Sequence, residues 1–129
     1  MLGSAAQPPG RVLVVDDSRA VAVSTARILA ATYEVIVSHS GADALSLLAA
    51  GEQFDVILCD LLMPHLSGFE LYDRLGAEMP DLRSRMVFVT GGTLEPEVHA
   101  FLDRVPNRCL TKPFKAHELR AVVAGILRR

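Results

Sequence analysis

The sequence of 129 residues has no tryptophan and only two cysteines, and aromatic residues make up 5% of it. So few rings offer little surface for stacking unpaired bases, which disfavours a binder of single-stranded nucleic acid. Positive charge is not in excess either, since 13 Lys and Arg stand against 15 Asp and Glu, and this disfavours nucleic-acid binding by charge. The cysteines, Cys59 and Cys109, lie within apolar runs, and we interpret both as buried, reduced thiols of a cytoplasmic protein.

Long hydrophobic segments are also missing. No apolar run approaches the roughly 18 residues that a membrane-spanning helix needs, so we expect no association with a membrane. Residues 1–10 have neither a basic cluster nor an apolar segment, which excludes a signal peptide, and their prolines and glycines indicate a flexible leader or a linker remnant. Half of the chain is hydrophobic, which is enough for the core of one domain over residues 11–129.

Short apolar runs alternate with stretches of helical character. Five runs predict strands: 12–15, 35–37, 56–59, 86–89 and 108–110. Five stretches that follow them predict helices: 19–31, 42–50, 68–79, 95–104 and 119–127. Because several of the strands are apolar at nearly every position, they are typical of a parallel sheet that is covered on both faces. The sequence therefore predicts an α/β fold of (βα)₅ type, with a doubly wound parallel sheet and helices on both faces.

Polar side chains follow four of the five predicted strands. Asp16 and Asp17 follow the first strand, Asp60 the third, Thr90 the fourth and Lys112 the fifth. In a doubly wound sheet the site lies beyond the carboxyl ends of the strands, where the strand order reverses. We therefore expect these residues to share one pocket, although each alone is also consistent with a turn or a helix cap.

The charges of this pocket indicate its chemistry. Three carboxylates repel one another unless positive charge lies nearby. Lys112 supplies one such charge, and Mg²⁺, which prefers oxygen ligands, supplies two, so that the complete set is neutral. We expect the pocket to hold Mg²⁺ and to accept one phosphoryl group, with a hydrogen bond from Thr90 and charge pairing from Lys112.

Four segments carry a resemblance to a known family. They read Val-Leu-Val-Val-Asp16-Asp17-Ser, Leu-Cys-Asp60-Leu-Leu-Met-Pro-His-Leu-Ser-Gly, Val-Thr90-Gly-Gly and Leu-Thr-Lys112-Pro-Phe. Together they resemble the receiver domain of bacterial two-component response regulators, over about residues 11–129. The resemblance implies the flavodoxin-like strand order 2-1-3-4-5 and a cis peptide bond after Lys112.

The resemblance also implies a metal site. Asp17 corresponds to the direct Mg²⁺ ligand, and Asp16 to a second acidic residue that often acts through a water molecule. Asp60 and the backbone carbonyl of Leu62 correspond to the remaining protein ligands.

The resemblance further implies a phosphorylation switch. Asp60 corresponds to the carboxylate that takes a phosphoryl group from the phosphohistidine of a sensor histidine kinase or a phosphotransfer protein. Thr90 corresponds to a hydroxyl that moves toward this group, and Lys112 to the amine that pairs with it. Residues 95–127 correspond to the surface that then changes, which is also the candidate contact of a homodimer.

Other interpretations remain open. An aspartyl-phosphate phosphatase of the haloacid-dehalogenase type is disfavoured because its acidic pair is spaced by one residue, whereas Asp16 and Asp17 are adjacent. A degenerate receiver that only binds partners would lack a site residue, and none is missing. The segments after Thr90 and before Lys112 resemble receivers at the C-terminus of hybrid sensor kinases, and a free-standing regulator is the alternative.

Two departures from the family pattern affect expectations. Many receivers carry an aromatic ring three residues before the lysine, and this chain has Cys109 at that position. We therefore expect no aromatic switch there. The alternative is that Cys109 only packs in the core.

The second departure concerns the path of the water that hydrolyses the acyl phosphate. Leu62 and Gly92, two residues beyond Asp60 and Thr90, offer no polar side chain to orient that water. We predict slow dephosphorylation of the purified phosphoprotein, which can be measured as the retention of a phosphoryl label. Loss of the label within seconds would contradict this prediction.

Overall fold

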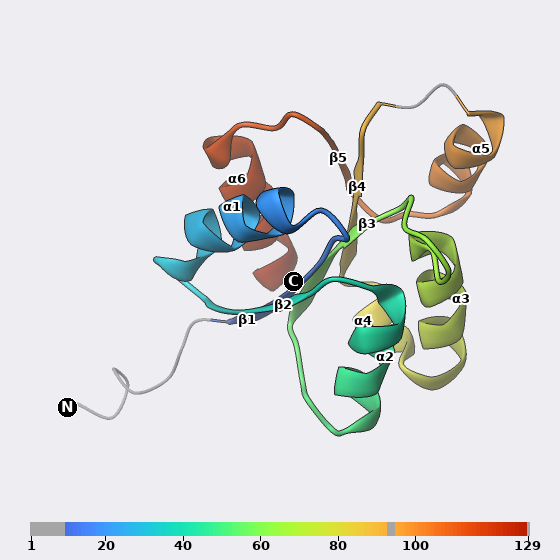
Figure 1. The fold of residues 1–129 in the computed structure, drawn as a ribbon, viewed down its shortest axis with the longest axis horizontal. Helices are drawn as coiled ribbons and strands as arrows, with labels where there is room; N and C mark the ends of the chain where they lie inside the picture. The colour runs from blue at the N-terminus through green and yellow to red at the C-terminus, as the bar shows by residue number, and fades with distance from the viewer. Residues whose placement is uncertain (1–9, 93–94, 129) are drawn as a thin grey trace.

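The computed structural model describes residues 10–92 and 95–128. Strands alternate with helices along the chain, with two helices in succession between the third and fourth strands (Figure 1). The strands are β1 (Arg11–Val15), β2 (Glu34–Ser38), β3 (Val56–Asp60), β4 (Met86–Thr90) and β5 (Cys109–Thr111). The helices are α1 (Arg19–Ala30), α2 (Gly41–Ala49), α3 (Gly68–Glu78), α4 (Pro80–Arg83), α5 (Pro96–Arg104) and α6 (Ala116–Leu127). None of the helices in the described part of the chain has the length and apolar character to cross a membrane.

The five strands form one parallel sheet in the order β2-β1-β3-β4-β5, which confirms the predicted fold. The register aligns the carboxyl ends of neighbouring strands. Asp60 lies opposite Val89, and Thr90 lies opposite Thr111. The ends of β3, β4 and β5 therefore meet at one edge of the sheet, which is where the sequence analysis places the site.

Helices cover both faces of the sheet (Figure 1). On one face α1 and α6 bury Leu29 and Leu119 against Val12 and Val14 of β1. On the other face α2, α3, α4 and α5 enclose a second core that includes Leu13. Successive side chains of β1 thus point to opposite cores, as the alternation along a strand requires. Burial on both sides explains the continuous apolar runs of the central strands.

The predicted helices are present, but their bounds and number differ from the prediction. The short helix α4 was not predicted, because its four residues are too few to show a helical period. Pro80 at its first turn favours this helix, since the missing N–H of proline costs nothing there. The last helix begins at Ala116 instead of residue 119, where the polar first turn hides the apolar spacing. There the N–H of Lys115 donates to the carboxylate of Glu118 at 2.8 Å.

The interpretation of Cys109 as a buried thiol is wrong, whereas that of Cys59 is confirmed. Cys59 is fully buried in β3, but Cys109 is exposed. β5 is a three-residue strand at the edge of the sheet, and only its central residue, Leu110, is buried. An apolar run therefore indicates the strand correctly without showing that both faces are covered. The alternative role of Cys109 in core packing is likewise excluded.

A close backbone contact fixes the start of α3 beside the end of β3. A Cβ atom at Gly68 would lie 2.7 Å from the carbonyl oxygen of Asp60 and 2.9 Å from the Cα of Leu61. Both are backbone atoms, so no side-chain rotation relieves the contact. The helix N-terminus can approach β3 this closely only because residue 68 has no side chain.

We predict that Gly68→Ala destabilises the domain by about 1–3 kcal/mol, the usual cost of inserting a methyl group into a packed interior. Urea unfolding measures this change. The matched control is Gly125→Ala in α6, where a Cβ meets nothing within 4 Å. This control removes a helix-interior glycine and is expected to stabilise the domain by about 0.5–1 kcal/mol. Equal unfolding midpoints for Gly68→Ala and the unchanged protein would contradict the prediction.

Candidate functional site

Three aspartates converge at the carboxyl edge of the sheet. Asp16 and Asp17 follow β1, and Asp60 ends β3. One carboxylate oxygen from each lies within 4.8 Å of the other two. Asp16 and Asp60 are buried, whereas Asp17 is exposed. The structure therefore brings together the three acidic residues that the sequence analysis places at this edge of the sheet.

Local hydrogen bonds hold the end of β1 in position. The N–H of Asp16 donates to the carbonyl of Ser38 at 3.0 Å, which continues the pairing of β1 with β2. Its carboxylate Oδ1 accepts the N–H of Ser18 at 2.9 Å. Ser18 in turn caps α1, since its hydroxyl accepts the N–H of Val21. The turn from β1 to α1 therefore fixes the orientation of the Asp16 carboxylate.

Lys112 connects two of the carboxylates from the opposite side. Its Nζ lies 3.1 Å from Oδ2 of Asp16 and 3.4 Å from Oδ2 of Asp60. The backbone N–H of Lys112 donates to the carbonyl of Thr90 at 2.7 Å, and its peptide bond to Pro113 is cis, as expected. One ammonium group thus links segments from the first, third and last strands.

Burial and the charges of the pocket shift the pKa values of Asp60 and Lys112. Burial raises the pKa of Asp60, and the nearby carboxylate of Asp16 raises it further, while Lys112 opposes this shift. Partial burial alone would lower the pKa of Lys112, but its hydrogen bond to Asp16 and the charge of Asp60 outweigh burial and leave it raised. Lys112 therefore stays protonated at neutral pH, and the pocket sets one ammonium group against three carboxyl groups.

The donor set of the pocket fits a small divalent cation. Mg²⁺ binds oxygen ligands at about 2.0–2.1 Å, so two of its ligands lie at most about 4.2 Å apart. The observed spread of 4.8 Å among the three carboxylate oxygens needs only a small contraction to match this. Asp17, which is exposed, leaves the cluster open on one side for ligands that do not come from the protein.

Thr90 contributes an unsatisfied polar group. Among the described residues its hydroxyl oxygen is buried and has no hydrogen-bond partner. Such a group costs about 1–3 kcal/mol relative to a satisfied one. Thr90 lies at the end of β4, beside the strand that carries Asp60. The hydroxyl is therefore poised for a hydrogen bond that a ligand of this pocket would provide.

Leu62 lies directly beyond Asp60. Its N–H donates to Oδ1 of Asp60 at 3.3 Å, and its residue is 43% exposed. The backbone at this position therefore borders the pocket, and the side chain projects into solvent. That its carbonyl binds a metal stays a prediction.

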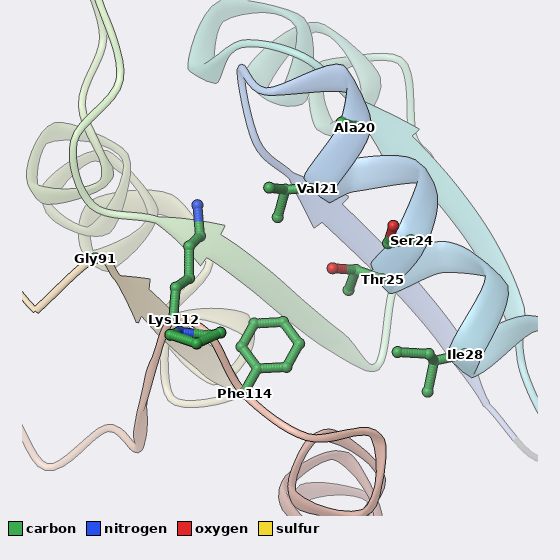
Figure 2. Close-up of a pocket in the computed structure, with 9 residues that line it drawn as sticks. Ala20, Val21, Ser24, Thr25, Ile28, Gly91, Lys112 and Phe114 are labelled. Carbon is green, nitrogen blue, oxygen red and sulfur yellow. The ribbon is translucent and has the colours of Figure 1, made fainter.

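A groove that the sequence did not predict lies beside the pocket. This groove of about 540 Å³ lies between α1 and the segment from β5 to α6, and it includes the aliphatic part of Lys112 (Figure 2). Its walls are mainly apolar, with Val21 and Ile28 from α1 facing Phe114 (Figure 2). The hydroxyl of the buried Thr25 points into it. No single run of sequence carries this surface, because it arises only when the two ends of the domain pack together.

The fold and the acidic pocket define a receiver-type α/β domain. A model of the response regulator receiver domain family matches residues 12–124. The chain therefore belongs to the family of response regulator receiver domains of two-component systems.

Relatives and solved structures agree with this assignment. The response regulator MprA of Mycobacterium avium (strain 104) is 37% identical over 120 residues, which cover 92% of this chain and 51% of that protein. The chain thus spans about half the length of the curated relatives it matches. A CheY-like receiver domain from Methanospirillum hungatei JF-1 matches with a TM-score of 0.80 and 28% identity, covering 92% of this chain and 93% of that one. Chemotaxis protein CheY4 of Vibrio cholerae matches with a TM-score of 0.77 and 29% identity, covering 90% and 97%.

We predict that Asp60→Asn stabilises the domain in a buffer without divalent cations. Below the ordinary carboxyl pKa of 3.8, Asp60 is protonated in both the folded and the unfolded chain. As the pH rises, the unfolded chain ionises first because the folded pKa is raised, and folding loses free energy that the neutral amide does not lose. At pH 7 the melting temperature of the variant should exceed that of the unchanged protein by a few degrees. For a domain of this size, this corresponds to about 1 kcal/mol in the free energy of unfolding. Near pH 4 the difference should be smaller.

Thermal melts across this pH range test the prediction. Asp103→Asn, an exposed change on α5, is the control for loss of one negative charge. Mg²⁺ should raise the melting temperature of the unchanged protein more than that of Asp60→Asn. A variant that melts below the unchanged protein at pH 7 would show that ionised Asp60 stabilises the fold.

Proposed function

We propose that this chain is a phosphoacceptor in two-component signalling. Asp60 takes the phosphoryl group of a phosphohistidine on a sensor histidine kinase or a phosphotransfer protein. An oxygen of the carboxylate forms the new bond to phosphorus, the P–N bond breaks, and its electron pair stays with the imidazole. The observation that carries this proposal is the position of the Asp60 carboxylate, 3.4 Å from the Lys112 ammonium and beside two further aspartates.

Charge stabilisation by the chain drives the transfer. Asp60 is a weak nucleophile, so the surroundings must lower the barrier by compensating charge on the phosphoryl oxygens. Lys112 provides one positive charge and keeps the Asp60 oxygen oriented. We assign Asp16, Asp17, Asp60 and the carbonyl of Leu62 as the groups that hold Mg²⁺, which supplies further positive charge to the phosphoryl oxygens when bound.

Thr90 is the sensor of the transferred group. Its buried hydroxyl lacks a partner among the described residues, so a new acceptor oxygen on Asp60 offers it a hydrogen bond. Movement of Thr90 toward that oxygen shifts β4 and the helices packed on it between two arrangements. We propose that the surface formed by α5, β5 and α6 thereby changes its affinity for partners, including a second copy of the chain.

The groove along α1 is the proposed docking surface for the phosphohistidine-bearing protein. The partner must bring its imidazole to Asp60, and it must then cover the surface next to the pocket. The groove lies there, since Lys112 contributes both to its wall and to the charge pairing of Asp60 (Figure 2). Apolar side chains such as Ile28 and Phe114 suit contact with apolar residues of that partner. We place this encounter in the cytoplasm, where kinases meet ATP.

Incubation with acetyl phosphate and Mg²⁺ tests the proposed chemistry. We expect the intact protein to gain the mass of one phosphoryl group, with loss of this gain in Asp60→Asn and retention in Asp103→Asn. Removal of Mg²⁺ by a chelator should slow the gain by at least about tenfold. Turnover of free phosphoesters would instead indicate a phosphatase, and no reaction would indicate a module that only binds partners.

We predict that Phe114→Ala and Ile28→Ala separate the two sources of phosphoryl groups. Both changes remove apolar surface from the groove without touching a carboxylate. Transfer from the phosphorylated partner should fall by about tenfold or more, which corresponds to about 1.4 kcal/mol of docking energy. Labelling by acetyl phosphate should stay within about twofold of the unchanged protein, which corresponds to about 0.4 kcal/mol or less. Ala121→Ser, on the exposed part of α6, is the control, and equal loss with both donors would exclude a docking role for the groove.

A further inference from the structure

Four aromatic rings lie together between β4, α3 and α5. They come from Phe88 of β4, Phe69 and Tyr72 of α3, and Phe101 of α5, and we call them the aromatic cluster. Phe101 is its centre, with ring centroids 4.7 Å from Phe69, 5.2 Å from Phe88 and 5.4 Å from Tyr72. All three of these pairs meet edge to face. The cluster therefore joins a central strand of the sheet to α5 through ring contacts.

The aromatic cluster is connected to Thr90 through β4. Phe88 precedes Thr90 by two residues, so both side chains point to the same face of the sheet. Phe88 is fully buried, and it contacts Phe101 as well as Tyr72. A displacement of Thr90 that moves the end of β4 must therefore alter the packing of Phe88 against α5, because a close-packed interior transmits strain.

When Thr90 moves, the rings of the aromatic cluster can change only from one packing arrangement to another. Edge-to-face pairs have a preferred geometry worth about 0.5–1.5 kcal/mol beyond the burial of the rings, so the rings repack as a set instead of sliding continuously. A hollow of about 280 Å³ lies beside the cluster and is lined by Phe69 and Phe101. Rings displaced toward this hollow find space without opening a new void in the core.

The exposed edge strand offers no comparable connection. Cys109 belongs to neither core among the described residues, and its thiol donates to the carbonyl of Leu110 at 3.8 Å. We propose that the aromatic cluster, and not residue 109, passes the change at Thr90 to α5. This inference rests on the proposed function and assigns its output pathway within the domain.

Fluorine NMR of the protein labelled with fluorotyrosine tests the inference. The chain has two tyrosines, Tyr72 in the cluster and Tyr33, which is partly buried against the other core, on the face of α1 and α6. The experiment adds acetyl phosphate and Mg²⁺ and measures phosphoryl uptake by mass on the same sample. We expect the Tyr72 resonance to move and the Tyr33 resonance to stay. In Thr90→Ala, compared at the same phosphoryl occupancy as measured by mass, the movement of the Tyr72 resonance should be lost.

A second fluorine label examines the competing pathway, which would run through Cys109 and β5. A trifluoromethyl reagent attached to Cys109 reports on β5, because Cys59 is fully buried and does not react. Uptake with a stationary Tyr72 resonance overturns the inference, and so does a Tyr72 shift that is unchanged in Thr90→Ala. Phe69→Leu, at the rim of the hollow, should reduce the Tyr72 shift without reducing uptake. Absence of uptake in the unchanged protein overturns the proposed function, and the inference falls with it.

Discussion

The charge pairing of Lys112 with Asp16 and Asp60 is the constraint on which the site depends. Three acidic side chains at one edge of a sheet would otherwise push the strand ends apart. The ammonium group offsets part of this repulsion, and its two hydrogen bonds hold groups that are 96 and 52 residues away in the chain. The pocket therefore forms only when the first, third and last strands have taken their places. Its excess of carboxyl groups over ammonium groups is the property that favours a divalent cation.

The order of the strands makes this pocket possible. Parallel strands present their carboxyl ends at one edge, and the change in direction of the chain around β1 and β3 leaves that edge open between the helices. The helices on the two faces have different surroundings. α1 borders the groove beside Lys112, while α5 packs on the aromatic cluster. Access for a partner and response to phosphorylation thus belong, in our proposals, to opposite faces of the sheet.

Much of this arrangement follows from the sequence because burial leaves a clear pattern. Strands covered on both faces are apolar throughout, and the polar residues that end them mark the edge of the sheet, which locates Asp60 and Thr90 without coordinates. The helix α4 left no such pattern because it is a single turn. The exposure of Cys109 was missed because it depends on the position of β5 at the edge of the sheet, which the local sequence does not show. Two further features could not be predicted because they depend on distances between atoms. They are the pairing of Lys112 with two carboxylates and the missing hydrogen-bond partner of the Thr90 hydroxyl.

The absence of a side chain at Gly68 has a consequence for motion. The first turn of α3 packs directly against the backbone of Asp60, so backbone contact opposes a shift of Asp60 toward α3. Any adjustment to a larger group on Asp60 must be taken up elsewhere in the domain. On the other side of Asp60, the neighbouring strand β4 carries the unsatisfied hydroxyl of Thr90, and a hollow lies beside Phe69 of α3 and Phe101 of α5. In our proposals, a phosphorylated Asp60 is therefore confined on the side of α3, and the movement that follows phosphorylation is directed toward β4.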